Sequence, residues 1–251
     1  MISNRVYLIT LALATSLATG SSRADDLDLT GWSVGLGGTV ITSPYASADD
    51  MIVPIPYISY QGDRFAVSPI GASFAFLQQS GVSVSAILAP RFQAVDRNKT
   101  PALKGMADRN PTAEAGLRVD LSPGFGMVWL EALTDIASVH RGQQLSVGYG
   151  ARLGSERFNV TPRAALVWQS GRLGDYYYGV RKSEARQGRA AYSIDDAVTW
   201  SLGVDVQYAL ARRLSAVSFI TYDVLPKQIT SSPIVDADGV GQAVVGLIYK
   251  F

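Results

Sequence analysis

The most reactive candidate in this sequence is its single histidine, His140, which lies five residues after Asp135. A carboxylate beside an imidazole can activate a water molecule or a serine hydroxyl for hydrolysis. No motif ties a serine or a second acidic residue to this pair, and both residues fall at the predicted junction of a strand and a short loop. We therefore expect the pair to order the loop, assign no catalytic residue and do not predict an enzyme.

Metal and cofactor sites have less support still. One histidine and no cysteine leave mainly carboxylate pairs as ligands, Asp49-Asp50 and Asp195-Asp196, and such pairs are typical of solvated loops. No glycine-rich phosphate-binding motif falls between a strand and a helix. With 22 basic against 21 acidic residues, the chain shows no basic stripe that would neutralise phosphates. We predict no metal, no cofactor and no nucleic-acid partner.

A tyrosine cluster is the remaining candidate site. Tyr176, Tyr177 and Tyr178 stand in a row, followed by Glu184 and Tyr192. Such a segment is more aromatic than expected for a loop without a structural or binding role, because tyrosines gather either in recognition surfaces or in packed loops. The composition leaves both interpretations open, namely a partner or surface recognition site and a lid over whatever lies beneath.

Long β-strands must position these side chains. Every second residue of 198–210 is apolar and the opposite face is more polar or small, which is the period of a β-strand, and the pattern recurs at 32–40, 113–121, 145–153 and 158–168. These runs exceed the ~5–6 residues of soluble strands and match the ~9–11 that cross a bilayer at a tilt. Only 17% of the residues are charged, below the ~25% usual in soluble domains. The pattern predicts an all-β fold, an antiparallel transmembrane β-barrel of the outer membrane in contact with its lipid.

The placement of aromatic residues separates this barrel from a soluble one. Trp200 and Tyr208 lie eight residues apart on one apolar face, about the spacing of two interfacial girdles. The last strand alternates through Tyr249 and ends on Phe251. A terminal phenylalanine on an alternating strand looks like the assembly signal of bacterial outer-membrane barrels, and we assign that role to Tyr249 and Phe251.

The first 24 residues are predicted to be a cleaved signal peptide. Arg5 precedes an apolar run of about 13 residues, and Ser22-Arg23-Ala24 is a small-x-small cleavage site. A membrane anchor would need ~20 apolar residues. We expect residues 25–251 to form one transmembrane β-barrel domain.

Strand parity predicts the topology. With both termini in the periplasm the strand number must be even, with short turns on the periplasmic side and long loops outside. Residues 64–77 are broken by Pro69 and Gly71, and counting them as two short strands gives about twelve strands. The long connections 94–111, 170–196 and 225–239 then all lie on the extracellular side.

The inward faces of these strands carry charges of both signs. Mixed charges in a narrow barrel favour a paired network that fills the lumen, although a small channel remains an alternative. The inward-facing charged residues are Glu114, Arg118, Asp120, Arg152, Arg163, Asp205 and Lys250.

The order and spacing of several short motifs resemble the MipA/OmpV family of Gram-negative outer-membrane proteins. The resemblance covers nearly all of residues 25–251, and its most telling piece is Tyr177-Tyr178-Gly179-Val180 with Glu184-Ala185. One departure is Ala46-Ser47, where the family often has an Arg-Gly pair. The other matching segments are Ser43-Pro44-Tyr45, Val53-Pro54-Ile55-Pro56-Tyr57-Ile58-Ser59-Tyr60, Leu103-Lys104-Gly105-Met106 with Arg109, Glu114-Ala115-Gly116-Leu117, Asp135 with His140 and Gly142, Thr161-Pro162, Ser232-Pro233-Ile234 and Tyr249-Lys250-Phe251.

The resemblance implies a non-enzymatic role in the cell envelope. The family includes MltA-interacting scaffold proteins, which bind a membrane-bound lytic transglycosylase and a bifunctional murein (peptidoglycan) synthase. Other members are described as adhesins or stress-responsive envelope proteins. A scaffold for periplasmic enzymes should use the periplasmic turns or the leader, whereas an adhesin should use the extracellular tyrosine loop.

Overall fold

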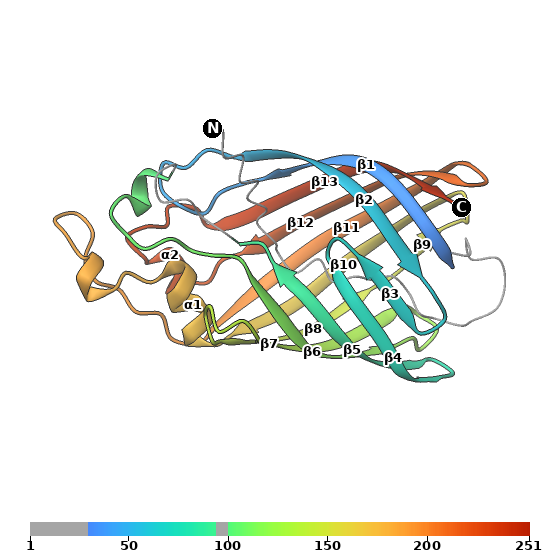
Figure 1. The fold of residues 1–251 in the computed structure, drawn as a ribbon, viewed down its shortest axis with the longest axis horizontal. Helices are drawn as coiled ribbons and strands as arrows, with labels where there is room; N and C mark the ends of the chain where they lie inside the picture. The colour runs from blue at the N-terminus through green and yellow to red at the C-terminus, as the bar shows by residue number, and fades with distance from the viewer. Residues whose placement is uncertain (1–29, 94–99) are drawn as a thin grey trace.

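The computed structural model describes residues 30–93 and 100–251, so the predicted signal peptide lies outside the described residues. Within these ranges one antiparallel sheet of thirteen strand segments closes on itself through β10 and β11 (Figure 1). No helix of the described ranges is long and apolar enough to span a membrane. The elements are β1 (Gly31–Ile41), β2 (Met51–Gln61), β3 (Phe65–Ser68), β4 (Gly71–Gln79), β5 (Val82–Arg91), η1 (Pro101–Leu103), β6 (Thr112–Leu121), β7 (Met127–Asp135), β8 (Gln143–Gly150), β9 (Leu153–Gly154), β10 (Phe158–Gln169), α1 (Gly171–Tyr178), η2 (Lys182–Glu184), β11 (Ala197–Ala211), β12 (Leu214–Val224), α2 (Lys227–Thr230) and β13 (Gly239–Lys250).

The strand count confirms the parity prediction. β9 continues β8 along the same edge of β10, so thirteen segments make a closed barrel of twelve strands. The region 64–77 is indeed two strands, β3 and β4, separated by Pro69 and Ile70. Gly71 begins β4 with φ 141°, and a Cβ there would lie 2.4 Å from the carbonyl oxygen of Leu88. The turn therefore requires glycine at this position.

Alternation sorts the side chains onto two faces, as predicted for residues 198–210. On β11, Trp200 is 54% exposed and Tyr208 is also exposed, whereas Thr199, next to Trp200, is buried. Asp205 and Gln207 point inward, where they pair with Arg163 and Asn159 of β10. A barrel in lipid gains by turning its apolar side chains outward, which is why a period of two runs through nearly every strand.

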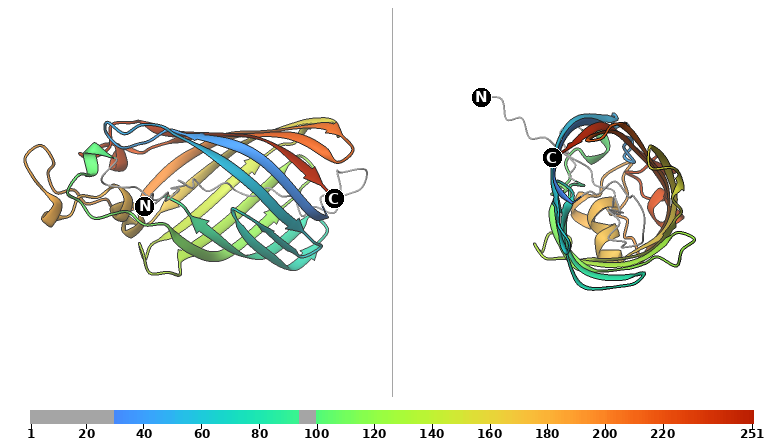
Figure 2. Two further views of the ribbon diagram at one scale, coloured as in Figure 1. Left: turned by 45° about the horizontal axis from the view of Figure 1, so that its top comes forward. Right: turned by 90° about the vertical axis from the view of Figure 1, so that its right-hand side faces the viewer.

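The two ends of the barrel differ. At one end, here called the turn end, strands are joined by tight turns, and the N–H of Phe251 donates to the carbonyl of Trp32 at 3.0 Å. At the other, the loop end, longer connections carry α1 and α2. Figure 2 shows α1 within the outline of the barrel when it is viewed along its axis. By the usual topology of bacterial barrels, the turn end faces the periplasm and the loop end the exterior.

Candidate functional site

The loop end is closed by a packed cluster, which we call the lid and define as residues 42–50, 100–111, 170–196 and 225–238. Its apolar side chains come from four connections and from the adjoining strand ends, so it is a core of its own at the mouth of the barrel. The fully buried members are Ile41, Tyr45, Leu103, Met106, Leu173, Tyr177, Ile229 and Ile234.

Two carboxylates fix helix α1, one at its first residue and one near its middle. The N–H of Gly171 donates to Asp196 at 2.8 Å, while Asp175 accepts from the N–H of Ile194 at 2.6 Å. Leu173 and Tyr177, four residues apart on one side of the helix, are thereby turned into the lid core. A short helix of this length depends on such tertiary contacts for its stability.

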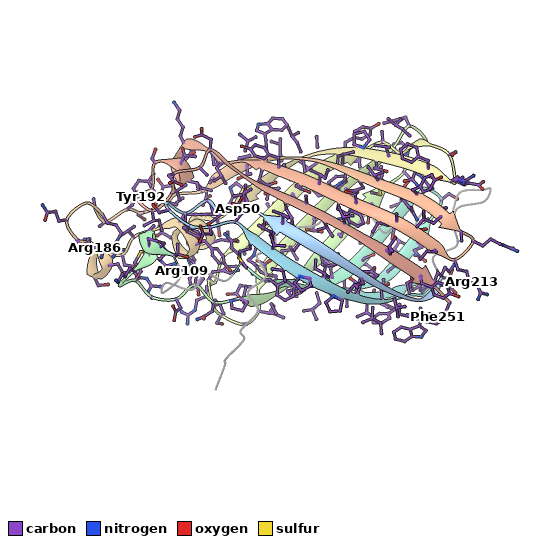
Figure 3. The ribbon with its side chains drawn as sticks, turned by 90° about the horizontal axis from the view of Figure 1, so that it is seen from above. Asp50, Arg109, Arg186, Tyr192, Arg213 and Phe251 are labelled. Carbon is purple, nitrogen blue, oxygen red and sulfur yellow. The ribbon has the colours of Figure 1, made fainter. Side chains whose placement is uncertain are left out.

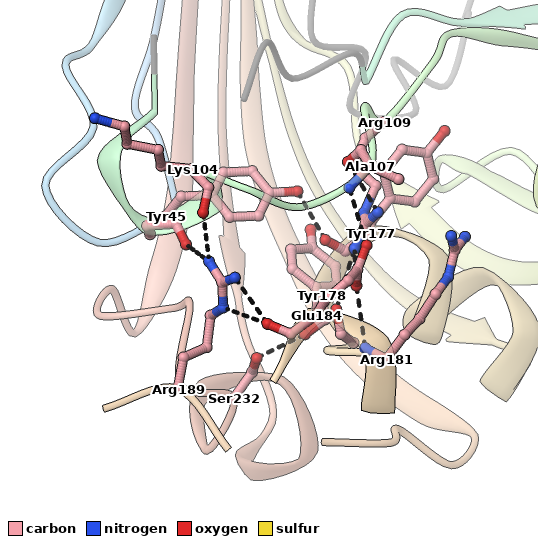
Figure 4. A network of polar contacts seen from close by, with 12 residues as sticks. Tyr45, Lys104, Ala107, Arg109, Tyr177, Tyr178, Arg181, Glu184, Arg189 and Ser232 are labelled. Carbon is pink, nitrogen blue, oxygen red and sulfur yellow. Dashed lines mark hydrogen bonds and ion pairs between the residues drawn. The ribbon is translucent and has the colours of Figure 1, made fainter. Parts of the chain in front are cut away.

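Glu184 joins two of the lid connections. Its carboxylate accepts the N–H of Ala107 at 2.9 Å and of Arg181 at 3.1 Å, and lies 3.5 Å from the guanidinium of Arg109 (Figure 4). Burial acts to raise the pKa of Glu184, but the backbone hydrogen bonds and the Arg109 charge outweigh it, so the net pKa lies below its ordinary value. The carboxylate is therefore ionised and held in place at neutral pH.

Arg189 completes the same junction through backbone carbonyls. Its guanidinium donates to the carbonyls of Glu184 at 2.8 Å, Ala102 at 2.8 Å and Lys104 at 3.1 Å. Neither arginine was identified from sequence as a site residue. The bonds that join separate connections are long-range, spanning 70 residues from Arg109 to Gly179 and 87 from Arg189 to Ala102, so the local sequence did not show which groups the arginines bind.

The tyrosines lie mostly inside the lid. The hydroxyl of Tyr45 donates to the carbonyl of Tyr177 at 3.0 Å, and Gln93 donates to the hydroxyl of Tyr178 at 2.9 Å. Burial raises the pKa of Tyr178 to about 12. Tyr176 is half-buried, and its hydroxyl accepts the N–H of Asn110 at 2.8 Å. The burial of Tyr177, Tyr178 and Glu184 favours the lid over a surface recognition site.

His140 and Asp135 do not form a side-chain pair. The carboxylate of Asp135 accepts the backbone N–H groups of His140 at 2.8 Å and Arg141 at 2.7 Å, which orders the loop between β7 and β8. The buried imidazole accepts the N–H of Gly142 at Nδ1, 2.9 Å, so its proton resides on Nε2, which lies 3.2 Å from Glu114. This arrangement agrees with the expected loop-ordering role.

Ion pairs line the lumen below the lid. Arg91 contacts Glu114 at 2.9 Å, Arg118 contacts Asp120 at 2.9 Å and Glu131 at 3.2 Å, and Arg163 contacts Asp205 at 2.9 Å. The predicted paired network is confirmed for these strands. Arg152 keeps the inward register, because the pairing of β8 and β9 with β10 places it opposite Thr161, but its side chain is exposed near the turn end, away from the central network. Lys250 is half-buried at the turn end, away from the central network.

Two members of the lumen network, Arg91 and Glu131, were missed from sequence. Both lie on inward-facing positions of alternating strands, β5 and β7, so the same period of two that identified Glu114 could have found them. No group of three or more His, Asp and Glu side chains within residues 30–93 and 100–251 is placed to hold a metal ion.

The predicted assembly signal lies at the turn end. Tyr249 and Phe251 both face outward, Phe251 with 64% of its surface exposed, and their ring centroids are 5.4 Å apart. Figure 3 shows Phe251 near Arg213, at the opposite end of the barrel from Arg109, Arg186 and Tyr192 of the lid. Their role in assembly stays a prediction.

Comparisons with known proteins agree with this architecture. The chain is 30% identical over 225 residues to "Putative outer membrane protein YiaT" of Escherichia coli K12, covering 87% of this chain and 90% of that relative. It is 26% identical over 250 residues to "MltA-interacting protein" of the same strain, covering 98% and 99%. It is 26% identical over 208 residues to "Outer membrane protein OmpV" of Vibrio cholerae, covering 82% and 81%.

These relatives are named as outer-membrane proteins or as an interacting protein, and the fold is a barrel of the outer-membrane type. The resemblance drawn from the short motifs is confirmed at the level of the whole sequence. The model of the family described as "MltA-interacting protein MipA" matches residues 34–251. The chain therefore belongs to the MipA family of outer-membrane β-barrel proteins.

Proposed function

We propose that this protein is a non-enzymatic scaffold for murein-remodelling enzymes, binding a lytic transglycosylase and a bifunctional murein synthase. The observation that carries the proposal is the match to a relative named for its interaction with MltA, which extends over 98% of this chain. A match over the whole barrel includes the turns that face the periplasm, where murein enzymes work.

The turn end has the charge of a docking surface. Its turns expose five arginines against two acidic residues, which gives the periplasmic rim a positive field. Such a field steers an acidic partner surface and sets its orientation. The charged residues are Arg64, Arg152, Arg157, Arg212 and Arg213 against Asp63 and Glu156.

A channel and an adhesin or stress-responsive protein would each depend on a different part of the barrel. A small channel needs an open path, whereas here the lid core and the ion pairs of Arg91, Arg118 and Arg163 occupy the mouth and lumen. An adhesin or stress-responsive envelope protein would act through the exterior, where Lys182 and Arg186 expose their charges on the lid. These alternatives are distinguished by which end of the barrel is needed.

The test compares charge reversals at the two ends. Arg212→Glu with Arg213→Glu lies at the tip of the β11–β12 turn, and the matched control is Lys182→Glu with Arg186→Glu on the lid. Crosslinking in native membranes followed by pull-down should recover about tenfold less transglycosylase from the turn variant, and unchanged amounts from the lid variant.

The opposite result would overturn the scaffold. If neither variant changes enzyme recovery while the lid variant loses attachment to host surfaces, the protein acts as an adhesin. Charge reversal at exposed lid positions is preferable to replacing Tyr176, Tyr177 and Tyr178, because two of these tyrosines are buried and their removal would disturb the lid itself.

A further inference from the structure

As far as residues 30–93 and 100–251 show, the barrel wall is incomplete on one side. β3 has only four residues and pairs with β2 through Tyr60 and Gln61 alone, while β4 pairs with β5 only as far as Ala72 opposite Leu88. Among the described strands, none pairs with the free edge of β2 from Met51 to Ser59, or with that of β5 from Ala89 to Arg91. We call this region the wall opening. It is bounded toward the turn end by the β3–β4 turn, and in Figure 1 β2 and β5 diverge to the left of that turn, toward the loop end.

Prolines keep both edges of the wall opening from pairing. Gly62 donates its N–H to Phe65 of β3, so by the alternation of backbone groups Pro54 and Pro56 direct their nitrogen atoms to the same edge. Ser122, which follows β6, donates its N–H to the carbonyl of Gly81, so the odd-numbered residues of β5 direct their backbone groups to β6. The even-numbered Pro90 therefore directs its nitrogen toward the wall opening. Proline has no N–H to donate. The edges are therefore blunted, and an added strand would find donors missing on both sides.

The wall opening faces lipid. The outward residues of β2 beside it are apolar, with Ile52 79% exposed and Ile58 also exposed. Since two strands stop short, the backbones of β2 and β5 are separated there by roughly three strand spacings of ~4.8 Å.

A cavity of about 90 Å³ lies on the lumen side of the wall at this place. Its lining includes Leu88 and Pro90, which point outward, together with Arg91 and Arg118, which point into the lumen. Ile70 of the β3–β4 turn borders it from below. The cavity thus has an apolar mouth toward the membrane and a charged inner end.

The charges at the inner end of the cavity determine which head group of a membrane amphiphile can bind there. Two arginines and three acidic residues line it, and they are already paired as Arg91 with Glu114 and Arg118 with Asp120 and Glu131. Their sum is one negative charge, which opposes an anionic head. Among the described residues, however, the buried Nε of Arg91 has no hydrogen-bond acceptor. A buried unsatisfied donor is costly, so a neutral group with an acceptor oxygen fits there.

We propose that the wall opening is a lateral portal through which an uncharged single-chain amphiphile of the membrane, of the monoacylglycerol class, enters the barrel. Its head oxygen accepts the hydrogen bond from Arg91, and its alkyl chain passes between Pro90 and the β3–β4 turn to the lipid. This binding site is independent of any scaffold role, because it lies at the middle and loop end of the wall rather than on the periplasmic turns.

The test uses Trp129 as an internal reporter. The guanidinium of Arg118, which lines the cavity, lies 5.5 Å from the centroid of the Trp129 ring. The variant Trp32→Phe, Trp168→Phe, Trp200→Phe retains Trp129 alone of the chain's 4 tryptophans. In phosphatidylcholine liposomes, 1-monostearoylglycerol brominated at the chain carbons next to its ester, close to the head group, should quench this tryptophan saturably. A variant retaining Trp200 alone, on the lipid face, should be quenched only in proportion to the probe in the bilayer.

Variants of β5 distinguish binding in the portal from partition of the probe into the membrane. Ala89→Phe fills the cavity and should abolish the saturable quenching, Ala89→Leu should weaken it, and Ala86→Phe on the outer face of the same strand should leave it unchanged. A brominated alkyl sulfate of the same chain length should bind at least tenfold more weakly. Heat-modifiable migration in gels confirms that each variant is folded.

Three results would overturn the proposal. The first is quenching of Trp129 that rises linearly like that of Trp200, or that persists in folded Ala89→Phe. The second is equal or stronger binding of the alkyl sulfate, which would contradict the neutral head. The third is the detection of a crosslinked dimer in the same liposomes, in a yield that the double variant Pro54→Thr, Pro56→Thr increases. That result would make the edge of β2 a contact between two copies of the chain.

Discussion

Removing the carboxylate of Glu184 should loosen the lid while leaving the barrel intact. The substitution Glu184→Ala deprives buried Arg109 of its ion-pair partner and leaves the N–H groups of Ala107 and Arg181 without an acceptor. Loss of one partner of a buried pair costs about 3–5 kcal/mol. Arg109 keeps its bonds to the carbonyls of Ala107 and Gly179, which favours the lower value, about 3 kcal/mol of local stability.

Hydrogen exchange of the lid amides measures this effect directly. A loss of 3 kcal/mol corresponds to about 100-fold faster exchange at residues 101–109 and 181–189. Glu184→Gln, which keeps an acceptor oxygen but no charge, should show a smaller change, and Glu156→Ala at the exposed turn end should show none. If lid exchange in Glu184→Ala matched that of the unaltered protein, the carboxylate would not hold the lid and the reasoning from its contacts would be refuted.

The same carboxylate predicts how the lid responds to acid. Because hydrogen bonds and Arg109 hold the pKa of Glu184 below its ordinary value against the effect of burial, its contribution is fully present above the ordinary pKa of glutamate and is lost as the pH falls through the lowered value. Lid exchange, corrected for its intrinsic pH dependence, should therefore stay constant from pH 7 to about 5 and accelerate below about pH 4. Glu184→Ala should abolish that acceleration, and its persistence would assign the effect to another group.

The remaining predictions concern the wall, the terminus and the lumen. Val204→Arg on the lipid face should cost about 2–4 kcal/mol of unfolding free energy, while Gln207→Arg in the lumen should be mild, and equal losses in urea titrations would refute the barrel orientation. Deleting Phe251 should lower the yield of heat-modifiable barrel in the outer membrane, and full yield would remove the terminal residue from the assembly signal. Purified protein in planar bilayers should show no large, steady conductance, whereas a stable open pore would favour the channel. His140→Ala should leave envelope phenotypes unchanged, and a selective loss of lipid or peptide hydrolysis would instead indicate an enzyme.

The strands could be predicted from sequence because successive residues of a barrel strand face lipid and lumen in turn, so apolar and polar side chains alternate with a period of two. Trp200 and Asp205 show this on a single strand, and the break at Pro69 and Gly71 gave the correct strand number. The consequence of that break was not predictable, since the wall opening depends on how far β3 and β4 extend relative to β2 and β5.

The lid could not be predicted beyond its tyrosine-rich composition. Its contacts join residues distant in the sequence, as in the bond between Tyr45 and Tyr177, 132 residues apart. Sequence spacing also suggested Asp135 as the partner of the His140 imidazole, whereas strand β6 presents Glu114 to it. Neither relation leaves a local signal, because both arise only when the barrel brings its strands together.

The pairing of β1 with β13 has a consequence for the order of events during assembly. Residues 33–41 find their partners at 242–250, so the two ends of the sequence must meet before the cylinder can close. Contacts of such large sequence separation form slowly. Until the last strand arrives, β1 presents an unpaired edge that could join a neighbouring chain. The polypeptide must therefore be kept from premature self-association throughout its passage across the periplasm, and closure of the ring cannot begin before residues 242–250 have been synthesised.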